Sequence, residues 1–456
     1  MKLILLSGGS GKRLWPLSND ARSKQFLRLL QNEQGDMESM IQRIWKQLGA
    51  VHLQEDSIIS TSSTQVDIIQ NQIGCDVELL VEPHRRDTFP AIALAAVYLY
   101  SMKEISMNEV CVVMPVDAYV DDAFFEKLKQ LEHVLGDSEA QLALVGVKPT
   151  YPSEKYGYIV PHPRHDSMPY YQVNHFTEKP SKDVAEKLIE QQALWNCGVF
   201  AFRLETMITS LIDKGIPIHF EELLRQYHGL SSISFDYEVV EKTSRIAVLP
   251  YEGSWSDLGT WNTLTNQMKE RQVGKGLVDE TCRSTHLVNE LDIPVVVMGL
   301  SNAIVAASPD GILIAEKTVS HHVKEIVKDI ATRPMFEERR WGWYRVLDHD
   351  KSVDGREVLT KRIGVSAGKN LSYQLHYMRS EVWTIIRGEG VFCLDDKIFH
   401  VQAGDVLTIP VETKHAIKAI TDLEFIEVQT GVSLVEEDII RIYMTWEEIE
   451  KNCAWV

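Results

Sequence analysis

The sequence predicts an α/β domain with a mostly parallel sheet, followed by a short β-rich connector and a C-terminal β-barrel. Up to about residue 265, short apolar strands alternate with amphipathic helices, a pattern that favours parallel strands covered on both faces. Residues 266–338 hold only brief strands and one helix, and residues 339–456 are rich in strands and glycine turns. A chain of 456 residues also exceeds what one hydrophobic core supports, so we expect these three parts as domains: 1–265, 266–338 and 339–456.

The predicted elements follow that division. The strands of the first part are short and apolar: Leu3–Leu6, Ser57–Thr61, Val110–Pro115, Gln141–Val147 and Gly198–Phe202. Its helices are Met37–Leu48, Ala91–Tyr100 and Asp183–Gln192. The connector has strands Pro294–Met298, Ala303–Ala307 and Gly311–Ala315, then a helix His321–Ile330, and the chain ends with a helix around Glu447–Lys451. Ligands bind at the carboxyl ends of parallel strands, so the loop at Gly8, Asp117 and the turn before Tyr156 can share one pocket.

The segment after the first strand has the composition of an anion-binding loop. It reads Ser7-Gly8-Gly9-Ser10-Gly11-Lys12-Arg13-Leu14-Trp15-Pro16-Leu17, and Lys24 follows closely. Glycines can take positive φ and turn their N–H groups toward an anion, while Lys12, Arg13 and Lys24 supply positive charge. We therefore predict that Gly8, Gly9, Gly11 and Lys12 bind a nucleoside triphosphate.

Two well-known phosphate loops do not fit this segment. A Walker A loop would need glycine and Ser or Thr where the chain has Leu6 and Arg13, and the dinucleotide motif would need glycine at Leu14. The segment instead resembles the signature G-G-x-G-x-R-L-x-P-L of the sugar-1-phosphate nucleotidyltransferases, in which a lysine follows about ten residues on. The alternative is a glycine turn beside a solvated basic face.

A second block resembles the bacterial mannose-1-phosphate guanylyltransferases. Their segment E-P-x-x-R-[DN]-T-x-P-A-I-A-L-A-A matches the chain from Glu82 to Ala96, including Arg86, Asp87 and Thr88. The resemblance implies that Glu82, Arg86 and Thr88 bind the nucleotide. Taken alone, the block could equally be a helix start capped by Pro90.

Two distant aspartates are candidate magnesium ligands. Asp117 ends the buried strand Val113-Met114-Pro115-Val116, where a carboxylate beside phosphates is a hard oxygen ligand. Asp257 lies in a segment similar to the family's W-x-D-x-G-x-W, and the resemblance implies that it is the partner. Arg13, Lys24, Asp117 and Asp257 are therefore the predicted catalytic residues. Either aspartate could instead be a turn former or helix cap.

Three further segments carry the sugar side of the resemblance: Tyr156-Gly157-Tyr158, Phe176-Thr177-Glu178-Lys179-Pro180 and Trp195-Asn196-Cys197-Gly198-Val199-Phe200. It implies that Lys179 binds the sugar phosphate, whereas Glu178, Asn196 and the Gly157 backbone bind hydroxyls. A point charge suits a phosphate, and a carboxylate and an amide suit directed hydrogen bonds to a pyranose. The alternative for Glu178 and Lys179 is a surface ion pair.

Together these segments imply a Rossmann-like nucleotidyltransferase that makes GDP-mannose and pyrophosphate from GTP and mannose 1-phosphate with Mg²⁺ and without a protein nucleophile. Two alternatives stay open: a nucleotidyltransferase for another sugar 1-phosphate, of glucose or heptose type, and a nucleotide-sugar sensor without turnover.

Residues 340–445 resemble the type II phosphomannose isomerase domain, a cupin barrel, of the bifunctional guanylyltransferases. Gln374 and His376 lie two apart on a predicted strand and so face the same way, and with Glu381 and His415 they form a set suited to a divalent metal such as zinc. Arg441 matches the terminal D-I-x-R of the family. The family's motif has two more histidines where this chain has Met378 and Val382. The domain is therefore predicted to be either a fructose 6-phosphate/mannose 6-phosphate isomerase or a structural or regulatory cupin.

Composition excludes other classes of function. A net charge of −18 without a basic run disfavours nucleic acid, and positive charge is concentrated at residues 12–24 and 84–86. No apolar run reaches the roughly 18 residues of a membrane span, and Met1 leads directly into a strand, so we expect a cytoplasmic protein. The six cysteines lack C-x-x-C spacing and are expected to be reduced. The oligomeric state stays open, with a homodimer as one candidate.

Overall fold

The computed structural model describes residues 1–9, 11–163, 168–330, 333–435 and 438–456. Ser10 of the glycine loop lies outside this set. The described chain divides into two compact units: the first comprises residues 1–66, 72–271 and 316–325, and the second comprises residues 67–71, 272–315 and 326–456. The predicted domain boundaries at 265 and 338 stay a prediction.

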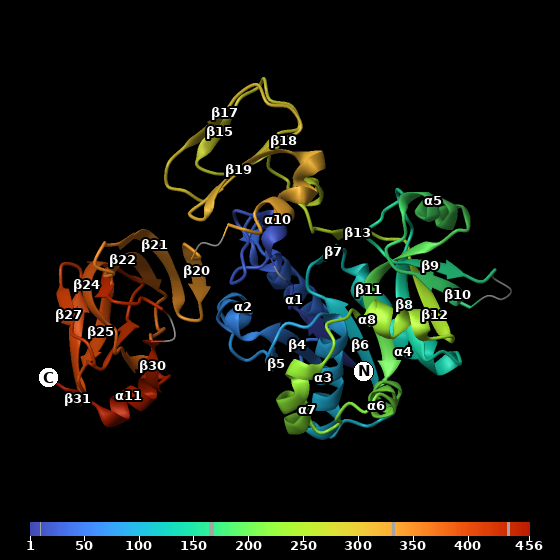
Figure 1. Ribbon diagram of the computed structural model, residues 1–456, viewed down its shortest axis with the longest axis horizontal. Helices are drawn as coiled ribbons and strands as arrows, with labels where there is room; N and C mark the ends of the chain where they lie inside the picture. The colour runs from blue at the N-terminus through green and yellow to red at the C-terminus, as the bar shows by residue number, and fades with distance from the viewer. Residues whose placement is uncertain (10, 164–167, 331–332, 436–437) are drawn as a thin grey trace. The chain divides into compact units, whose positions relative to one another are not determined.

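The first unit is built on a nine-stranded sheet formed by the described residues, in the order β5-β4-β1-β6-β11-β8-β12-β10-β9 (Figure 1). Its strands are β1 (Lys2–Leu6), β4 (Ser57–Ser62), β5 (Leu79–Glu82), β6 (Val110–Pro115), β8 (Leu142–Val147), β9 (Tyr158–Pro161), β10 (Tyr171–Thr177), β11 (Leu194–Arg203) and β12 (Ile246–Tyr251). All the strands predicted from the sequence are present, with ends shifted by a few residues.

The sheet is mixed, which corrects the prediction of a mostly parallel sheet. β5, β4, β1 and β6 run parallel, and β8 and β12 run parallel. β11 is antiparallel to β6, to β8 and to β9, and β10 is antiparallel to β9 and β12. Strand direction depends on how the connections before and after a strand return to the sheet, and the apolar pattern within a strand carries no information on this.

The described helices of the chain up to residue 326 are α1 (Met40–Ala50), α2 (Val66–Ile73), α3 (Thr88–Ser101), α4 (Ala123–Asp137), α5 (Lys182–Glu190), α6 (Leu204–Asp213), α7 (Phe220–Gln226), α8 (Phe235–Glu238), α9 (Trp261–Thr265) and α10 (Val323–Ile326). The apolar helix α3 packs against β1 and β5, and α4 packs against β6, β8, β11 and β12. The core between the sheet and α3 includes Ile4, Val113 and Phe200.

Two predicted helices are shorter in the structure. Met37 and Glu38 form the strand β3, which pairs with β2 (Leu30–Gln31), and α1 begins only after a capping box between Ser39 and Gln42. This is the S-x-x-Q signature of a helix start, so the sequence held the signal. The helix expected at His321–Ile330 is a 3₁₀ segment Lys317–His322 followed by one turn, α10.

Two local features position the site in this unit. β7 (Ala118–Val120) and β13 (Trp255–Asp257) form a two-stranded ladder directly after β6. β11 contains an irregularity between Asn196 and Phe200, where Gly198 has φ +75°. Because a glycine takes this left-handed conformation without strain, the strand can bend beside Asn196 and continue into the sheet.

The second unit contains the connector and the C-terminal domain. The connector strands are β14 (Gln272–Gly274), β15 (Gly276–Val278), β16 (His286–Asn289), β17 (Val295–Val297), β18 (Ala303–Ser308) and β19 (Gly311–Glu316). β14, β16 and β18 are parallel neighbours, as are β15 and β17. A small core that includes Val278, Leu287 and Val305 fills the space between them.

The C-terminal domain is β-rich, with two six-stranded sheets in the described residues. One has the order β20-β21-β22-β29-β24-β27, with bounds Phe336–Arg339, Gly342–Lys351, Glu357–Val365, Leu423–Gly431, Arg379–Arg387 and Val406–Ile409. The other has the order β30-β23-β28-β25-β26-β31, with bounds Ile440–Tyr443, Tyr373–Leu375, His415–Ala419, Glu389–Leu394, Lys397–Gln402 and Ala454–Trp455. Helix α11 (Trp446–Asn452) begins with a Thr445/Glu448 capping box. Trp383 stacks on Phe425 with ring centroids 4.5 Å apart in the core.

No helix within the described ranges combines the length and the apolar character that crossing a membrane requires.

Candidate active sites

In the first unit, the two predicted metal-binding aspartates both form ion pairs with the ammonium group of Lys24. Lys24 Nζ lies 2.9 Å from Asp117 Oδ2 and 2.8 Å from Asp257 Oδ1. Asp117 follows β6, and the β7–β13 ladder brings Asp257 alongside by pairing it with Ala118. Lys24 comes from a short 3₁₀ turn, Lys24–Phe26, after the glycine loop. Three segments far apart in the sequence therefore converge at one point.

Burial and charge oppose each other at this point, and charge prevails. Burial disfavours the charged form of Lys24, but Asp117 and Asp257 outweigh it and raise the pKa of Lys24. Burial likewise opposes ionisation of Asp257, yet the Lys24 ammonium lowers the pKa of this carboxyl below its usual value. Both groups are therefore charged at neutral pH, and the site keeps its ionic character in a desolvated place.

Two cavities flank these residues. One, of about 230 Å³, is lined among others by Gly157, Glu178, Asn196 and Asp257. The other, of about 170 Å³, is lined by Gly9, Gly11, Arg13, Lys24, Gln25, Asp117 and Lys324. Arg13, Lys24 and Asp117 line both cavities, so they lie at the boundary between the glycine loop and the predicted sugar side.

The glycine loop is pinned by hydrogen bonds from the segment that follows it. Ser23 Oγ donates to the Gly9 carbonyl at 2.7 Å, and Gln25 Nε2 donates to the Ser7 carbonyl at 2.9 Å. A Cβ on Gly11 would lie 2.6 Å from the Ser23 Cα, so this glycine allows a close approach of two backbones. A Cβ on Gly9 would meet nothing within 4 Å. Gly9 therefore faces open space in the cavity.

Neither Lys12 nor Glu82 lines these two cavities. Lys12 Nζ pairs with Asp20 Oδ2 at 3.5 Å. Glu82 ends β5, accepts a hydrogen bond from the Tyr227 hydroxyl at 2.9 Å, and would lie 3.4 Å from a Cβ on Gly8. Burial raises the pKa of this carboxyl. Glu82 is thus a buried acceptor next to the start of the loop.

Arg86 and Thr88 hold the backbone of another segment in place. Arg86 Nη1 donates to the Leu230 carbonyl at 2.6 Å, and Thr88 Oγ1 accepts from the Phe235 N–H at 2.8 Å. These bonds fix the chain just before and at the start of α8. Neither residue lines the two cavities described above. In this structure, Arg86 and Thr88 hold the start of α8 and the segment before it in place.

The predicted sugar-binding residues are grouped in the larger of the two cavities, with one exception. Glu178 Oε2 is buried and has no hydrogen-bond partner among the described residues, and a Cβ on Gly157 would come within 2.5 Å of it. Asn196 lines the same cavity. Lys179 does not line it, since its ammonium pairs with Glu178 Oε1 at 2.6 Å and remains half exposed.

The sequence analysis missed Asp236 and Lys155, which also line this cavity. Asn196 Nδ2 donates to Asp236 Oδ1 at 2.7 Å. Burial, and then the nearby charge of Glu178, raise the pKa of Asp236 to about 7. Asp236 lies in the four-residue helix α8, which is too short to show a hydrophobic period. No sequence motif therefore identified it as a site residue. Lys155 adjoins Tyr156-Gly157 and could have been noticed as a cation beside that turn.

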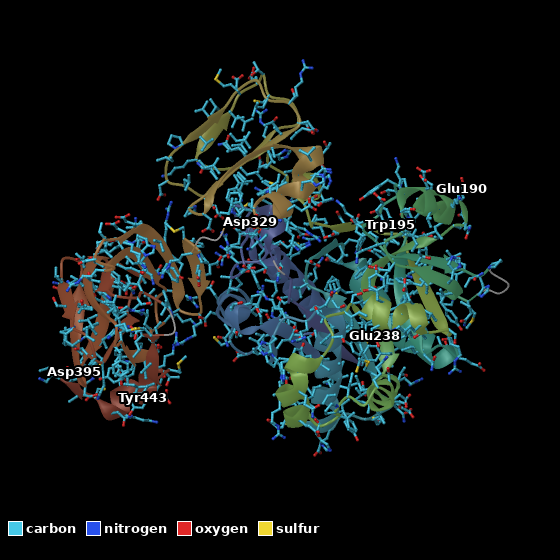
Figure 2. The ribbon with its side chains drawn as sticks, viewed as in Figure 1. Glu190, Trp195, Glu238, Asp329, Asp395 and Tyr443 are labelled. Carbon is cyan, nitrogen blue, oxygen red and sulfur yellow. The ribbon has the colours of Figure 1, made fainter. Side chains whose placement is uncertain are left out.

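Aromatic rings form one wall beside this cavity. Tyr156 contacts Trp195 edge-on at 4.9 Å and Trp255 at 5.4 Å between ring centroids. Trp195 lies in β11 of the first unit, where Figure 2 labels it. Rings in this arrangement exclude water and present an apolar face to a bound ring.

A second cluster of polar groups is buried in the C-terminal domain. His376 Nε2 lies 3.3 Å from Glu381 Oε1, and His415 Nε2 lies 3.6 Å from Glu381 Oε2. Ligand atoms of these three residues lie within 4.8 Å of one another, a spacing that could hold a metal ion. Gln374 Nε2 is 3.5 Å from His376 Nε2, and Gln374 pairs with His415 across β23 and β28. The structure thus brings all four predicted ligands together.

The two histidines present their Nε2 atoms to this cluster. His415 Nδ1 is 3.0 Å from the Thr413 carbonyl, so this nitrogen carries the proton and Nε2 keeps its lone pair. The Nε2 of His415 is buried without a hydrogen-bond partner among the described residues. Burial lowers the pKa of His415 to about 4, so the imidazole is neutral at pH 7. A neutral imidazole with an unused lone pair is the form that binds metals.

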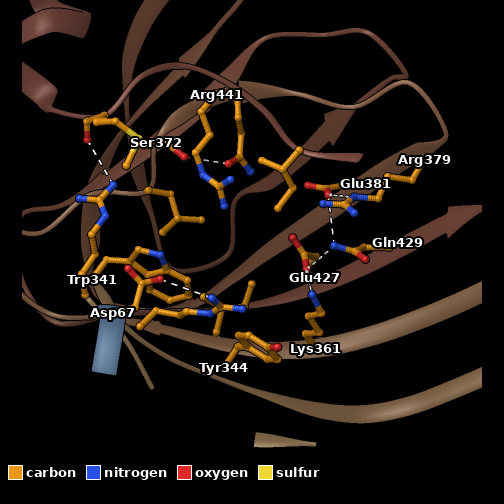
Figure 3. A pocket seen from close by; sticks show the side chains of 17 residues that line it. Asp67, Trp341, Tyr344, Lys361, Ser372, Arg379, Glu381, Glu427, Gln429 and Arg441 are labelled. Carbon is orange, nitrogen blue, oxygen red and sulfur yellow. Dashed lines mark hydrogen bonds and ion pairs between the residues drawn. The ribbon is translucent and has the colours of Figure 1, made fainter. Parts of the chain in front are cut away.

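A cavity of about 300 Å³ opens beside this cluster. Figure 3 shows Glu381, Arg379, Glu427, Lys361 and Arg441 around it. Arg379 Nε pairs with Glu381 Oε1 at 3.0 Å, and Lys361 Nζ lies 4.0 Å from Glu427 Oε2. Arg441, predicted from the D-I-x-R motif, lines the cavity from β30. The cations suit an anionic ligand such as a phosphate.

Met378 and Val382 lie away from this cluster. Both side chains are more than a third exposed, at 38% and 39%, whereas Glu381 and Trp383 on the same strand are buried. Neighbouring residues of a strand face opposite ways, so Val382 points to the other side of β24 from Glu381. The two missing histidines therefore remove no group from the metal-like cluster.

Comparisons with known proteins cover nearly the whole chain. Residues 2–272 match the protein family described as Nucleotidyl transferase, and residues 330–444 match the family described as Mannose-6-phosphate isomerase C-terminal. The first match spans the glycine loop, both aspartates and the predicted sugar-binding residues. The second spans the buried histidine cluster.

Several curated relatives are similar to this chain over nearly the full length of both proteins. A putative mannose-1-phosphate guanylyltransferase from Vibrio cholerae is 30% identical, over 96% of this chain and 98% of that protein. A mannose-1-phosphate guanylyltransferase from Salmonella typhimurium is 28% identical over 96% of each chain. An alginate biosynthesis protein from Pseudomonas aeruginosa is 30% identical over 96% of this chain and 95% of its own.

The chain is also similar to a solved structure. The crystal structure of a mannose-1-phosphate geranyltransferase from Thermus thermophilus has a TM-score of 0.61 and 30% sequence identity, and the match covers 72% of this chain and 98% of that one.

Proposed function

The chain belongs to the nucleotidyl transferase family, and we propose that it transfers GMP from GTP to mannose 1-phosphate, giving GDP-mannose and pyrophosphate. The observation that carries this proposal is the meeting of Asp117 and Asp257 on the Lys24 ammonium. This group lies at the boundary between a glycine-lined cavity and a cavity with the groups needed for a sugar, where phosphoryl transfer between two bound substrates has to occur.

Asp117 and Asp257 would hold the Mg²⁺ of the reaction. Two carboxylates already directed at one cation, the Lys24 ammonium, form an anionic donor set of the kind Mg²⁺ uses with substrate phosphates. When bound, the ion supplies charge that reduces the repulsion between two anionic reactants.

The residues of the chain position the reactants and neutralise charge. The glycine loop orients the triphosphate, so that the phosphate oxygen of the sugar attacks the α-phosphorus and pyrophosphate leaves. Arg13 and Lys24 stabilise the charge that develops on the phosphorus and on the leaving group. On the other side, Glu178 and Asn196 accept and donate hydrogen bonds to sugar hydroxyls, with Tyr156 and Trp255 excluding water.

A second activity is proposed for the C-terminal domain, because its described residues fit a metal site. The two sheets would form a cupin barrel in which Gln374, His376, Glu381 and His415 hold a divalent ion such as zinc. The Nε2 of His415 supports this, because it is buried without a hydrogen-bond partner among the described residues. The bound ion polarises the carbonyl and hydroxyl oxygens of the substrate. Arg441 and Arg379 would bind the phosphate of fructose 6-phosphate.

Isomerisation also needs a group that moves a proton between C1 and C2 of the sugar. Glu427 faces the cavity and lies 4.0 Å from Lys361, so it is our candidate for this role.

A substrate panel tests both activities. Pyrophosphate release is measured with four nucleoside triphosphates against mannose, glucose and heptose 1-phosphates, and GTP with mannose 1-phosphate is expected to give the highest kcat/KM. A higher value for another pair reassigns the substrate, and no release with any pair supports a sensor. Conversion of fructose 6-phosphate to mannose 6-phosphate, measured separately, decides between an isomerase and a structural domain.

A further inference from the structure

The glycine-lined cavity contains a cation from a distant part of the chain. Lys324 lines it together with Gly9, Gly11, Arg13 and Lys24. It stands in α10, about fifty residues beyond the end of the region that matches the nucleotidyl transferase family at residue 272. Residues 316–325 nevertheless belong to the first compact unit, although residues 272–315 before them belong to the second. The chain therefore returns to the first unit at this point.

Several contacts fix this returning segment beside the glycine loop. The 3₁₀ segment Lys317–His322 packs against α9, and Trp261 of α9 donates its indole N–H to the carbonyl of Trp15 at 3.1 Å. Trp15 directly follows the loop's own 3₁₀ turn. Ser320 and Val323 are buried and hold the segment, whereas the Lys324 side chain is exposed toward the cavity opening.

Among the described residues that line this cavity, Arg13 and Lys324 are the cations without an ion pair. Lys24 is neutralised by two carboxylates, and Lys12 pairs with Asp20. Lys324 makes no hydrogen bond or ion pair with any residue that the structure describes. An ammonium without a partner at the rim of an anion-binding cavity gains a charge-assisted hydrogen bond when a phosphate binds.

We propose that Lys324 binds the β- or γ-phosphate of the nucleoside triphosphate, so that the nucleotide site is completed by the segment after the connector. The assignment rests on the proposed function for the identity of the ligand. The phosphates beyond the α-phosphate are the part of the substrate that leaves as pyrophosphate. Lys324 would therefore act with Arg13 and Lys24 on the leaving group.

The test compares nucleotides that differ only in their phosphates. Dissociation constants for GTP, GDP and GMP are measured by calorimetry with Mg²⁺ for the full-length wild type, K324A, K324R and K127A. Lys127 is a partly exposed lysine of α4 that lines neither cavity, so K127A matches the charge change. We expect K324A to weaken GTP binding about tenfold and GMP binding less than about twofold, with K324R and K127A close to wild type.

Two results would overturn the assignment: unchanged GTP binding by K324A, or an equal loss for GTP and GMP, which would indicate a general disturbance of the site. If K324A unfolds, K324Q takes its place in the same comparison. Pyrophosphate release by the wild type is recorded in parallel. Its absence counts against the proposed reaction, while the dependence of nucleotide binding on Lys324 is still decided by the three dissociation constants.

Discussion

Asp257 pairs with Ala118 across the β13–β7 ladder, and this backbone pairing places its carboxylate next to that of Asp117. The ladder is only three residues long on each side, and it joins segments that are well over a hundred residues apart in the sequence. A pair of short strands thus builds the ionic centre of the site, in which the Lys24 ammonium lies between the two carboxylates.

Replacing Asp257 should abolish turnover without unfolding the chain. The variant D257N keeps the shape of the side chain but removes one of the two charges that hold Lys24 and would hold Mg²⁺. We expect kcat for pyrophosphate release to fall by about 10²- to 10³-fold, as when one electrostatic stabiliser is lost. Activity is measured at saturating GTP, and thermal unfolding confirms that the variant is folded.

D183N, on the exposed start of α5, is the matched control and should be unaffected. A D257N enzyme with near-normal kcat at all Mg²⁺ concentrations would refute the role.

A methyl group at Gly157 should block the sugar and leave the nucleotide unaffected. The Cβ of G157A would lie 2.5 Å from Glu178 Oε2 and 2.6 Å from Phe176 Cζ, so the Glu178 side chain has to move. We expect KM for mannose 1-phosphate to rise about tenfold, equivalent to about 1.4 kcal/mol, with KM for GTP nearly unchanged. Initial rates with each substrate varied in turn measure this.

The matched control for that substitution is G136A in α4, where the new Cβ would meet nothing within 4 Å. Gly136 lies in the last turn of α4, where alanine is expected to stabilise the fold by up to about 0.5 kcal/mol and to leave both KM values as they are. If G157A and G136A behave alike, Gly157 does not shape the sugar cavity.

Some of the site residues could be predicted from the sequence, and others could not. The motifs identified Asp117, Asp257 and Glu178 because each lies in a run of several residues with fixed spacing. Asp236 and Lys324 lie in one-turn helices without such runs, and only the tertiary fold brings them to the cavities. The direction of β11 could not be predicted from the sequence for the same reason, because it depends on how the chain returns to the sheet after α5.

In the C-terminal domain, the alternation of side chains along a strand decides which of the predicted residues reach the cluster. The spacing of Gln374 and His376 correctly placed both on one face of β23. The same alternation places Val382 on the other side of β24 from Glu381, so the missing histidine at this position removes no group from the cluster.

The stability of the chain should depend on the protonation of Asp236. Its pKa is about 7 in the folded protein, against 3.8 for the free side chain, because it is buried near Glu178. Between these values the folded state keeps a proton that the unfolded state has lost, so the wild type loses stability as the pH rises from about 4 to 7. The D236N side chain has no proton to lose in this range, so the variant does not lose stability in this way as the pH rises. The gain of D236N over wild type, measured by urea unfolding, should grow by about 2 kcal/mol between pH 5 and pH 8. A gain that is constant across this range would show that the carboxyl is already ionised at pH 5.

The metal of the C-terminal domain should depend on His415 and not on the two positions where the family's motif has further histidines. H415A removes a buried nitrogen that has no other partner, so we expect it to lose the bound divalent ion and the conversion of fructose 6-phosphate, while pyrophosphate release stays at the wild-type level. The metal content per chain is measured by elemental analysis after dialysis. The variants M378H and V382H restore histidines at positions whose present side chains are more than a third exposed, and Val382 faces the other side of β24 from Glu381. The metal content and isomerase rate should therefore not change. An increase in either quantity would mean that these positions turn toward the cluster in the working enzyme. Unchanged metal content in H415A would instead place the ion elsewhere, because without His415 the cluster keeps only His376, Glu381 and Gln374 around the cavity.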